Sequence, residues 1–123
     1  MVKLPLVLTT LAVLAWPASS LAQSAAFQAF AAANQELRTV IASYRTRLSE
    51  PQKLVFDQAH KLWVEYLQAA CEFHGSGSVD LDSHPTAVVS CLEFITRSQL
   101  EYMKYLASCE DTDPRCPVRR GDV

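Results

Sequence analysis

Residues 49–75 of this 123-residue chain read SEPQKLVFDQAHKLWVEYLQAACEFHG, and they decide the predicted fold. Ser49 stands three residues before Gln52, which is the spacing of a capping box at the start of a helix. Pro51 suits the first helical turn, where the missing N–H costs no hydrogen bond. Gly75 and Gly77 interrupt the pattern at its far end. The stretch therefore predicts one long helix.

Apolar residues in this helix recur at spacings of three and four, as on the buried face of an amphipathic helix. We expect that face to comprise Val55, Ala59, Leu62, Tyr66, Ala69 and Phe73. Further apolar residues flank it, namely Phe56, Trp63, Leu67 and Ala70. The apolar arc is wider than that of the helix predicted upstream, so we expect this helix to lie at the centre of the fold.

Two further helices flank this one. The upstream helix has an inward face of Phe27, Phe30, Asn34, Leu37, Ile41, Tyr44 and Leu48, in which Asn34 is the one polar residue and is expected to fix the helix register. The downstream helix begins at Ser83 or His84, ahead of Pro85, and should end near Ser108. Its inward side is expected to carry Val88, Cys91, Leu92, Ile95, Tyr102 and Leu106. Since no strand-like alternation competes, the fold class predicted is all-α, an antiparallel bundle of three long helices with disulfide staples.

The N-terminus has the pattern of a secretory signal peptide. Lys3 supplies a positive charge, residues 4–16 form an apolar run, and Pro17 leads into small residues that end at Ala22. A membrane anchor is the alternative, but the run is shorter than the roughly 20 apolar residues that a spanning helix needs. We therefore expect residues 1–22 to be removed. Residues 23–123 would then be a single periplasmic or secreted domain, with no membrane insertion of the mature chain.

Charge and composition exclude other classes of protein. Eleven Lys and Arg against thirteen Asp and Glu give a formal net charge of −2, so no basic excess is available to neutralise a phosphate backbone. We expect no nucleic-acid partner. Half of the residues are hydrophobic and only three are glycine, which is typical of a folded globular protein.

Four cysteines, Cys71, Cys91, Cys109 and Cys116, lie in the part of the chain expected to be exported. An even number of cysteines in an oxidising compartment predicts disulfides, and four cysteines allow three connectivities. The favoured pairs are Cys71 with Cys91 and Cys109 with Cys116. The second pair would tether a C-terminal tail that starts at Cys109, and we expect this tail to contribute nothing to a core because of its composition. Redox or metal chemistry is the alternative, but the chain has no Cys-x-x-Cys.

Residues 74–84, HGSGSVDLDSH, are expected to form a loop between the second and third helices. This loop exceeds the about two to eight residues that usually join antiparallel helices, which indicates a functional role. The candidate partner-binding residues are Glu72, His74, Asp80, Asp82 and His84. The histidines and aspartates could instead bind a divalent metal, but their spacing matches no strong ligand pattern. We expect no metal, no cofactor and, in the absence of a nucleophile–base pair, no enzyme.

Residues 62–73, with the spacing Trp-x-x-Tyr-x-x-x-x-Cys, the Gly-Ser-Gly-Ser that follows, and then Cys91-Leu92 and Thr96, resemble the lysozyme-inhibitor LprI N-terminal domain family. The resemblance runs from Asn34 to Leu106. Members often carry a cysteine before the first helix, which this chain lacks, and arginines where it has Leu67 and Gln99. The resemblance implies an exported, disulfide-linked helical protein, in a family of which at least one kind inhibits lysozyme.

The function expected is therefore that of a protein-binding module, an inhibitor of a cell-wall-degrading lysozyme. Its carboxylates would approach basic groups around the enzyme's cleft, and its histidines would supply adjustable hydrogen bonds. The alternative is an envelope interaction or immunity-like protein that binds a different protein partner. That alternative predicts an exposed apolar patch larger than on a typical monomer. A small enzyme or metal carrier is the third hypothesis.

Overall fold

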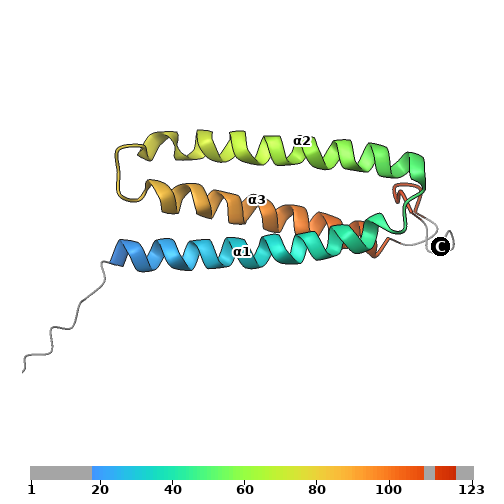
Figure 1. The fold of residues 1–123 in the computed structure, drawn as a ribbon, viewed down its shortest axis with the longest axis horizontal. Coiled ribbons are helices and arrows are strands. Elements are labelled where there is room, and N and C mark those ends of the chain that lie inside the picture. The colour runs from blue at the N-terminus through green and yellow to red at the C-terminus, as the bar shows by residue number, and fades with distance from the viewer. Residues whose placement is uncertain (1–17, 110–112, 119–123) are drawn as a thin grey trace, which may run out of the picture.

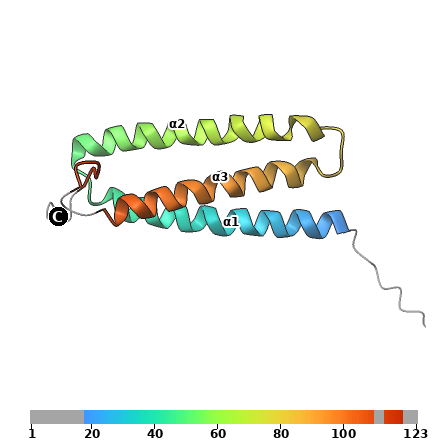
Figure 2. The same cartoon turned by 180° about the vertical axis from the view of Figure 1, so that it is seen from behind.

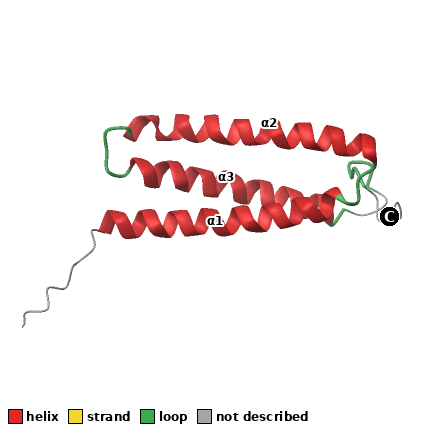
Figure 3. Ribbon diagram, in the orientation of Figure 1, coloured by secondary structure: helices red, strands yellow, loops and turns green. Residues whose placement is uncertain are grey.

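The computed structural model describes residues 18–109 and 113–118, which form three long helices and no strand. Helix α1 spans Ala18–Arg45, α2 spans Glu50–Gly75 and α3 spans His84–Ala107, with a short 3-10 helix, η1, at Ser76–Ser78. α1 and α3 run in the same direction and α2 runs opposite to both (Figure 1). Short connections join the helices at the two ends of the molecule (Figure 3). The predicted all-α class and three-helix bundle are confirmed.

The central helix is α3 and not α2. In opposite views α3 lies between α1 and α2 (Figures 1 and 2), and it packs more extensively on α1 than on α2. The expectation that α2 is central was wrong. A wide apolar arc suggested burial on several sides, whereas the structure buries only one strip of α2 and leaves the rest of the arc exposed.

The strip of α2 that packs on α3 is also not the predicted one. Leu67 and Cys71 are buried, with Phe56 and Trp63 half-buried beside them. The predicted face is exposed throughout, with Phe73 82% exposed. Because each residue turns an α-helix by about 100°, Cys71 and Phe73 point about 160° apart. A helix that turns Cys71 towards α3 therefore turns Phe73 towards solvent.

Two clusters of buried side chains hold the helices together. The larger lies between α1 and α3 and comprises Leu37, Tyr44, Leu48, Leu100, Met103, Leu106 and Val118. The smaller joins α2 to α3 and comprises Leu67, Cys71 and Cys91, with Trp63, Val88, Leu92 and Ile95 packed against it. Thr96 is fully buried on α3, and its hydroxyl has no hydrogen-bond partner in the described part of the chain.

The helix boundaries follow the local signals. At the start of α2 the backbone N–H of Ser49 donates to Gln52 Oε1 over 3.0 Å, and the N–H of Gln52 donates to Ser49 Oγ over 3.4 Å, which confirms the capping box. α3 begins after Ser83, carries Pro85 in its first turn and ends at Ala107, as predicted. α1 begins at Ala18, so the expected cleavage after Ala22 would remove residues 18–22 from its start.

Both predicted disulfides are present. Cys71 and Cys91 join α2 to α3 with their Cα atoms 5.5 Å apart, and Cys109 and Cys116 close the tail with their Cα atoms 5.7 Å apart. No cysteine of the four is free.

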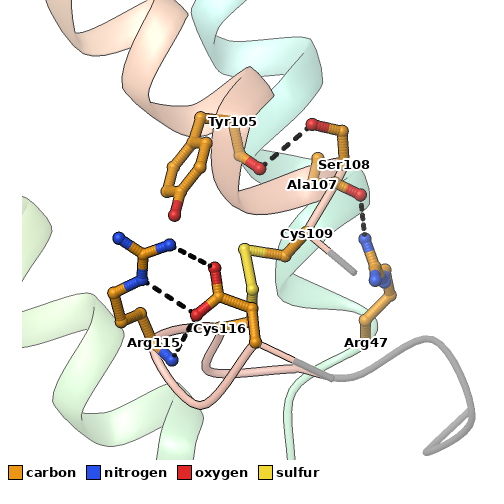
Figure 4. The surroundings of a disulfide bond; sticks show 8 residues. Arg47, Tyr105, Ala107, Ser108, Cys109, Arg115 and Cys116 are labelled. Carbon is orange, nitrogen blue, oxygen red and sulfur yellow. Dashed lines mark hydrogen bonds and ion pairs between the residues drawn. A yellow bond between two sulfur atoms is a disulfide. The ribbon is translucent and has the colours of Figure 1, made fainter. Parts of the chain in front are cut away.

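The tail was expected to contribute nothing to a core, and this was wrong. Val118 is buried in the larger cluster, and Gln52 Nε2 donates a hydrogen bond of 2.9 Å to the carbonyl of Pro117. Arg115 donates to the Asp113 carboxylate, which holds the pKa of Asp113 below its usual range (Figure 4). The disulfide returns the chain towards the helices, so an otherwise polar segment can bury one valine.

Candidate functional site

The connection between α2 and α3 forms one end of the bundle and carries the residues predicted to bind a partner. We call residues 72–84 the hairpin tip. Because α2 continues through Gly75 and α3 begins at His84, the link outside these helices covers only residues 76–83. That length is ordinary for a connection between antiparallel helices. The prediction of an unusually long loop was wrong, and loop length is no longer an indication of function.

Close contacts hold the hairpin tip in shape. The His84 Nδ1 lies 3.0 Å from the carbonyl oxygen of Gly75, and Ser78 Oγ donates to the same oxygen over 3.0 Å. A Cβ at Gly75 would lie 2.6 Å from Val88 Cγ2, so this close approach of α2 and α3 needs a glycine. The Cys71–Cys91 disulfide lies one turn further along. A tip fixed in this way loses little conformational entropy when it binds.

The structure separates the five predicted residues into two groups. Glu72 and His74 are exposed in the last turn of α2, and Asp80 and Asp82 are exposed in the link. His84 is half-buried, and its Nδ1 contacts the Gly75 carbonyl inside the tip. Four of the residues are therefore available on the surface, while His84 joins the two sides of the tip.

This end of the molecule carries negative charge. Residues 62–96 contain five carboxylates and neither Lys nor Arg, and residues 18–35 of α1, at the same end of the bundle, contain no charged residue (Figure 1). Glu65 and Glu93 are paired with Lys61 and Arg97. The other three, Glu72, Asp80 and Asp82, form no ion pair within residues 18–109 and 113–118. Such a concentration of one sign of charge attracts a cationic surface.

Exposed apolar side chains lie among these carboxylates. Phe73 follows Glu72, while Val79 and Leu81 alternate with Asp80 and Asp82 and are 64% and 58% exposed. Protein-binding sites combine apolar anchors with a polar rim in this way. Sequence reasoning missed the three anchors because it assigned Phe73 to the buried face of α2 and weighed only the polar residues of the link. The alternation Val-Asp-Leu-Asp was the available signal.

A second exposed apolar surface follows α2 along its length. We call it the α2 stripe, and it comprises Val55, Ala59, Leu62, Tyr66, Ala69 and Phe73. The stripe spans about 27 Å at 1.5 Å per residue. Single exposed apolar residues are normal on a monomer, whereas a row of six along one helix is a candidate interaction surface.

Two further findings concern the whole described part of the chain. Among residues 18–109 and 113–118, no three His, Cys, Asp or Glu side chains gather closely enough to hold a metal ion. None of the helices found there combines the length and the apolar character required to cross a membrane.

The fold and these surfaces define a small all-helical protein that is cross-linked by disulfides and exposes both an acidic end and an apolar stripe. The family model described as Lysozyme inhibitor LprI matches residues 17–103, and the chain belongs to this family. The match confirms the resemblance that residues 62–96 indicated. No curated protein and no solved structure matches the chain.

Proposed function

We propose that this protein is an exported inhibitor of a cell-wall-degrading lysozyme, and that it binds the enzyme through the hairpin tip. It acts by binding and catalyses no reaction. The observation that carries the proposal is the family match over residues 17–103. The two disulfides fit a protein that works in an oxidising compartment, periplasmic or secreted, after cleavage near Ala22.

The charge of the hairpin tip supports its role as the contact surface. Glu72, Asp80 and Asp82 would approach basic groups around the substrate cleft of a cationic lysozyme, and Phe73 would anchor the contact. His74 would supply a hydrogen bond at the edge. Long-range attraction of this kind accelerates encounter and weakens as salt screens the charges. The partner is thus a basic protein, and binding should weaken with ionic strength.

The first experiment measures clearing of a bacterial cell-wall suspension by lysozyme, with and without the purified protein, at low and moderate salt. We expect slower clearing that becomes less pronounced as salt rises. Lysozymes of several types should be compared, because inhibitors discriminate between them. If a severalfold molar excess of the protein slows none of the lysozymes tested, the proposal is wrong.

The second experiment locates the contact. The triple variant Glu72→Gln, Asp80→Asn, Asp82→Asn keeps the shape of the hairpin tip and removes three charges. If each carboxylate contributes about 0.5 kcal/mol at a partly exposed interface, inhibition should weaken about tenfold. The variant Phe73→Ala should weaken inhibition by a similar factor at every salt concentration, because its contribution is apolar.

A matched control separates the position of the charges from their number. Glu36, Glu50 and Glu101 lie away from the tip, and each is paired with a lysine on the surface. Replacing all three by Gln changes the net charge as much as the triple tip variant does. Inhibition should be nearly unchanged in this control. Equal loss in both triple variants would show that only total charge matters, and the tip would not be the contact surface.

The α2 stripe supports a second candidate function, an envelope interaction or immunity-like protein that binds a protein other than lysozyme. An exposed apolar stripe is the feature that this alternative predicts. Under it, the variant Leu62→Gln, Tyr66→Gln loses the partner in pull-downs from envelope extract, while the triple tip variant retains it. Under the lysozyme proposal, the same Leu62 and Tyr66 variant inhibits as well as the unaltered protein.

A further inference from the structure

An apolar groove adjoins the α2 stripe at the end of the molecule opposite to the hairpin tip. Its volume is 520 Å³, it lies close to the turn between α1 and α2, and all three helices and the tail line it. Val55 and Ala59 belong both to the stripe and to the wall of the groove. A cavity of about 150 Å³ already admits benzene, so an aromatic ring fits in this groove. The stripe and the groove therefore form one continuous apolar surface.

The stripe has the same pattern when it is read in reverse. Its six positions follow one another at intervals of 4, 3, 4, 3 and 4 residues, and the two alanines stand second from each end. When two copies of such a helix pack antiparallel about a two-fold axis, each residue meets the residue at the reversed position. Ala59 then faces Ala69 of the second copy, and Leu62 faces Tyr66 of the second copy. The stripe is thus complementary to itself.

The same pairing brings Phe73 of one copy to the groove of the other. Val55 and Phe73 are the two ends of the stripe, 18 residues or about 27 Å apart along α2. In the antiparallel pair, Phe73 of the second copy lies beside Val55, in the wall of the groove. Phe73 is the most exposed of the large hydrophobic side chains in the described residues. An aromatic side chain that enters an apolar pocket is a common anchor of protein interfaces.

Charge favours the antiparallel pair over a parallel one. The hairpin tip is acidic, whereas residues 38–53, at the opposite end of the bundle, contain four Lys or Arg and one Glu (Figure 1). A parallel pair would place two acidic tips side by side, while an antiparallel pair places each tip near the basic end of the other copy. Glu65 lies one residue from the centre of the stripe, and Lys61, 3.8 Å away, offsets its charge.

The exposed area suits a weak, reversible dimer. Val55 and Tyr66 are 73% and 62% exposed, and Phe73 more so. Since a covered aromatic side chain buries about 150–250 Å², covering the whole stripe removes roughly 500 Å² from each copy and about 1,000 Å² from the pair. Interfaces of about 1,000–1,200 Å² are at the low end of the specific range and are often transient. We therefore expect a dissociation constant in the micromolar range.

We propose that two copies of this chain form an antiparallel dimer through the α2 stripe, with Phe73 of each copy in the groove of the other. This dimer goes beyond the inhibition of lysozyme. Because Phe73 also belongs to the hairpin tip, dimerisation competes with the proposed contact to lysozyme, and the monomer is the inhibitory form. At chain concentrations below the dissociation constant of the dimer, a cell-wall assay measures the monomer alone.

Sedimentation equilibrium of the purified protein, without lysozyme, tests for the dimer. The apparent mass should rise from that of one chain at low micromolar concentration to that of two chains at millimolar concentration. A mass of one chain throughout would overturn the proposal and leave the stripe to a different partner.

One substitution and its matched control locate the contact. Ala59→Glu places a charge within the stripe beside the groove and should weaken the dimer at least about tenfold. Gln68→Glu adds the same charge at an exposed position of α2 outside the stripe, and the dimer should keep its affinity. If Ala59→Glu dimerises as well as the unaltered protein, or if both variants lose the same affinity, the stripe is not the contact.

Crosslinking tests the orientation of the two helices. A mixture of Ala59→Cys and Ala69→Cys chains should form a disulfide-linked dimer under mild oxidation, because these positions face each other in the antiparallel pair. Either variant alone should crosslink poorly, since position 59 lies about 15 Å from its own equivalent. If either variant alone crosslinks as efficiently as the mixture, the pair is not antiparallel and the proposal is wrong.

Failure of the dimer and failure of the inhibitor proposal are separate results. The dimer is measured on the isolated protein, and inhibition is measured on cell walls at chain concentrations where the dimer is dissociated. Under those conditions Ala59→Glu should inhibit lysozyme as the unaltered protein does, because it leaves the hairpin tip intact.

Discussion

Removal of the Cys71–Cys91 disulfide should cost this protein a large part of its stability. The bond links residues 20 apart in the sequence, and the loop-closure entropy of such a crosslink corresponds to about 3 kcal/mol. The Cys109–Cys116 bond links residues 7 apart, for which the same relation gives about 2 kcal/mol. Since Cys71 and Cys91 also form most of the smaller buried cluster, the double variant Cys71→Ala, Cys91→Ala should lose at least the larger amount.

Urea unfolding followed by circular dichroism measures this loss directly. For a chain of about 100 residues, 3 kcal/mol corresponds to a fall in melting temperature of about 12 °C or more. The double variant Cys109→Ala, Cys116→Ala is the control and should lose less. Reduction of the unaltered protein should lower stability by no more than both double variants together, because it breaks both crosslinks but keeps the buried sulfur atoms. A loss below about 1 kcal/mol for the Cys71 and Cys91 variant, or a larger loss for the tail variant, would refute the reasoning.

Three further predictions concern packing. Gly75→Ala should destabilise the protein by about 1–2 kcal/mol, because its Cβ would overlap the half-buried side chain of Val88. Gly77→Ala, with open space around it, should be neutral or stabilising. Leu67→Ala should lower the free energy of unfolding by about 2–3 kcal/mol, because Leu67 is buried, and Leu62→Ala should lower it by under about 1 kcal/mol, because Leu62 is exposed. Equal losses would show that a different face of α2 is buried. Thr96→Val removes a buried hydroxyl that has no partner, so it should raise the free energy of unfolding by about 1 kcal/mol; a lower melting temperature would mean that the hydroxyl is hydrogen-bonded in solution.

Part of the misassigned packing of α2 could have been found in the sequence. The predicted Cys71–Cys91 bond required Cys71 to face α3, yet Phe73 and Leu62, placed on the same buried face, point away from Cys71 on a regular helix. The two predictions were incompatible, and the disulfide was the stronger constraint because a bond between sulfurs tolerates only a few ångströms of separation. The exposure of the acidic residues of the hairpin tip could be predicted, since unpaired carboxylates are almost never fully buried.

Other features had no signal in the sequence. Val118 follows a polar, proline-containing stretch, and only the folded path of the chain carries it into the larger cluster. The groove near the turn between α1 and α2 is lined by Tyr44 of α1 and His60 of α2, and which residues line it depends on how the helices pack.

The sequence by itself indicated the starts of α2 and α3, the class of fold, the favoured disulfide pairs and the family. Each of these depends on groups close together along the chain or on the number and spacing of cysteines. Only the tertiary structure decided which helix is central, which face of α2 is covered and where an apolar groove lies. The physical reason is that α2 is apolar around much of its circumference, so periodicity identifies several strips that could be buried. Which strip is covered depends on the packing of Trp63, Leu67 and Cys71 against α3, and this is a property of the assembled bundle.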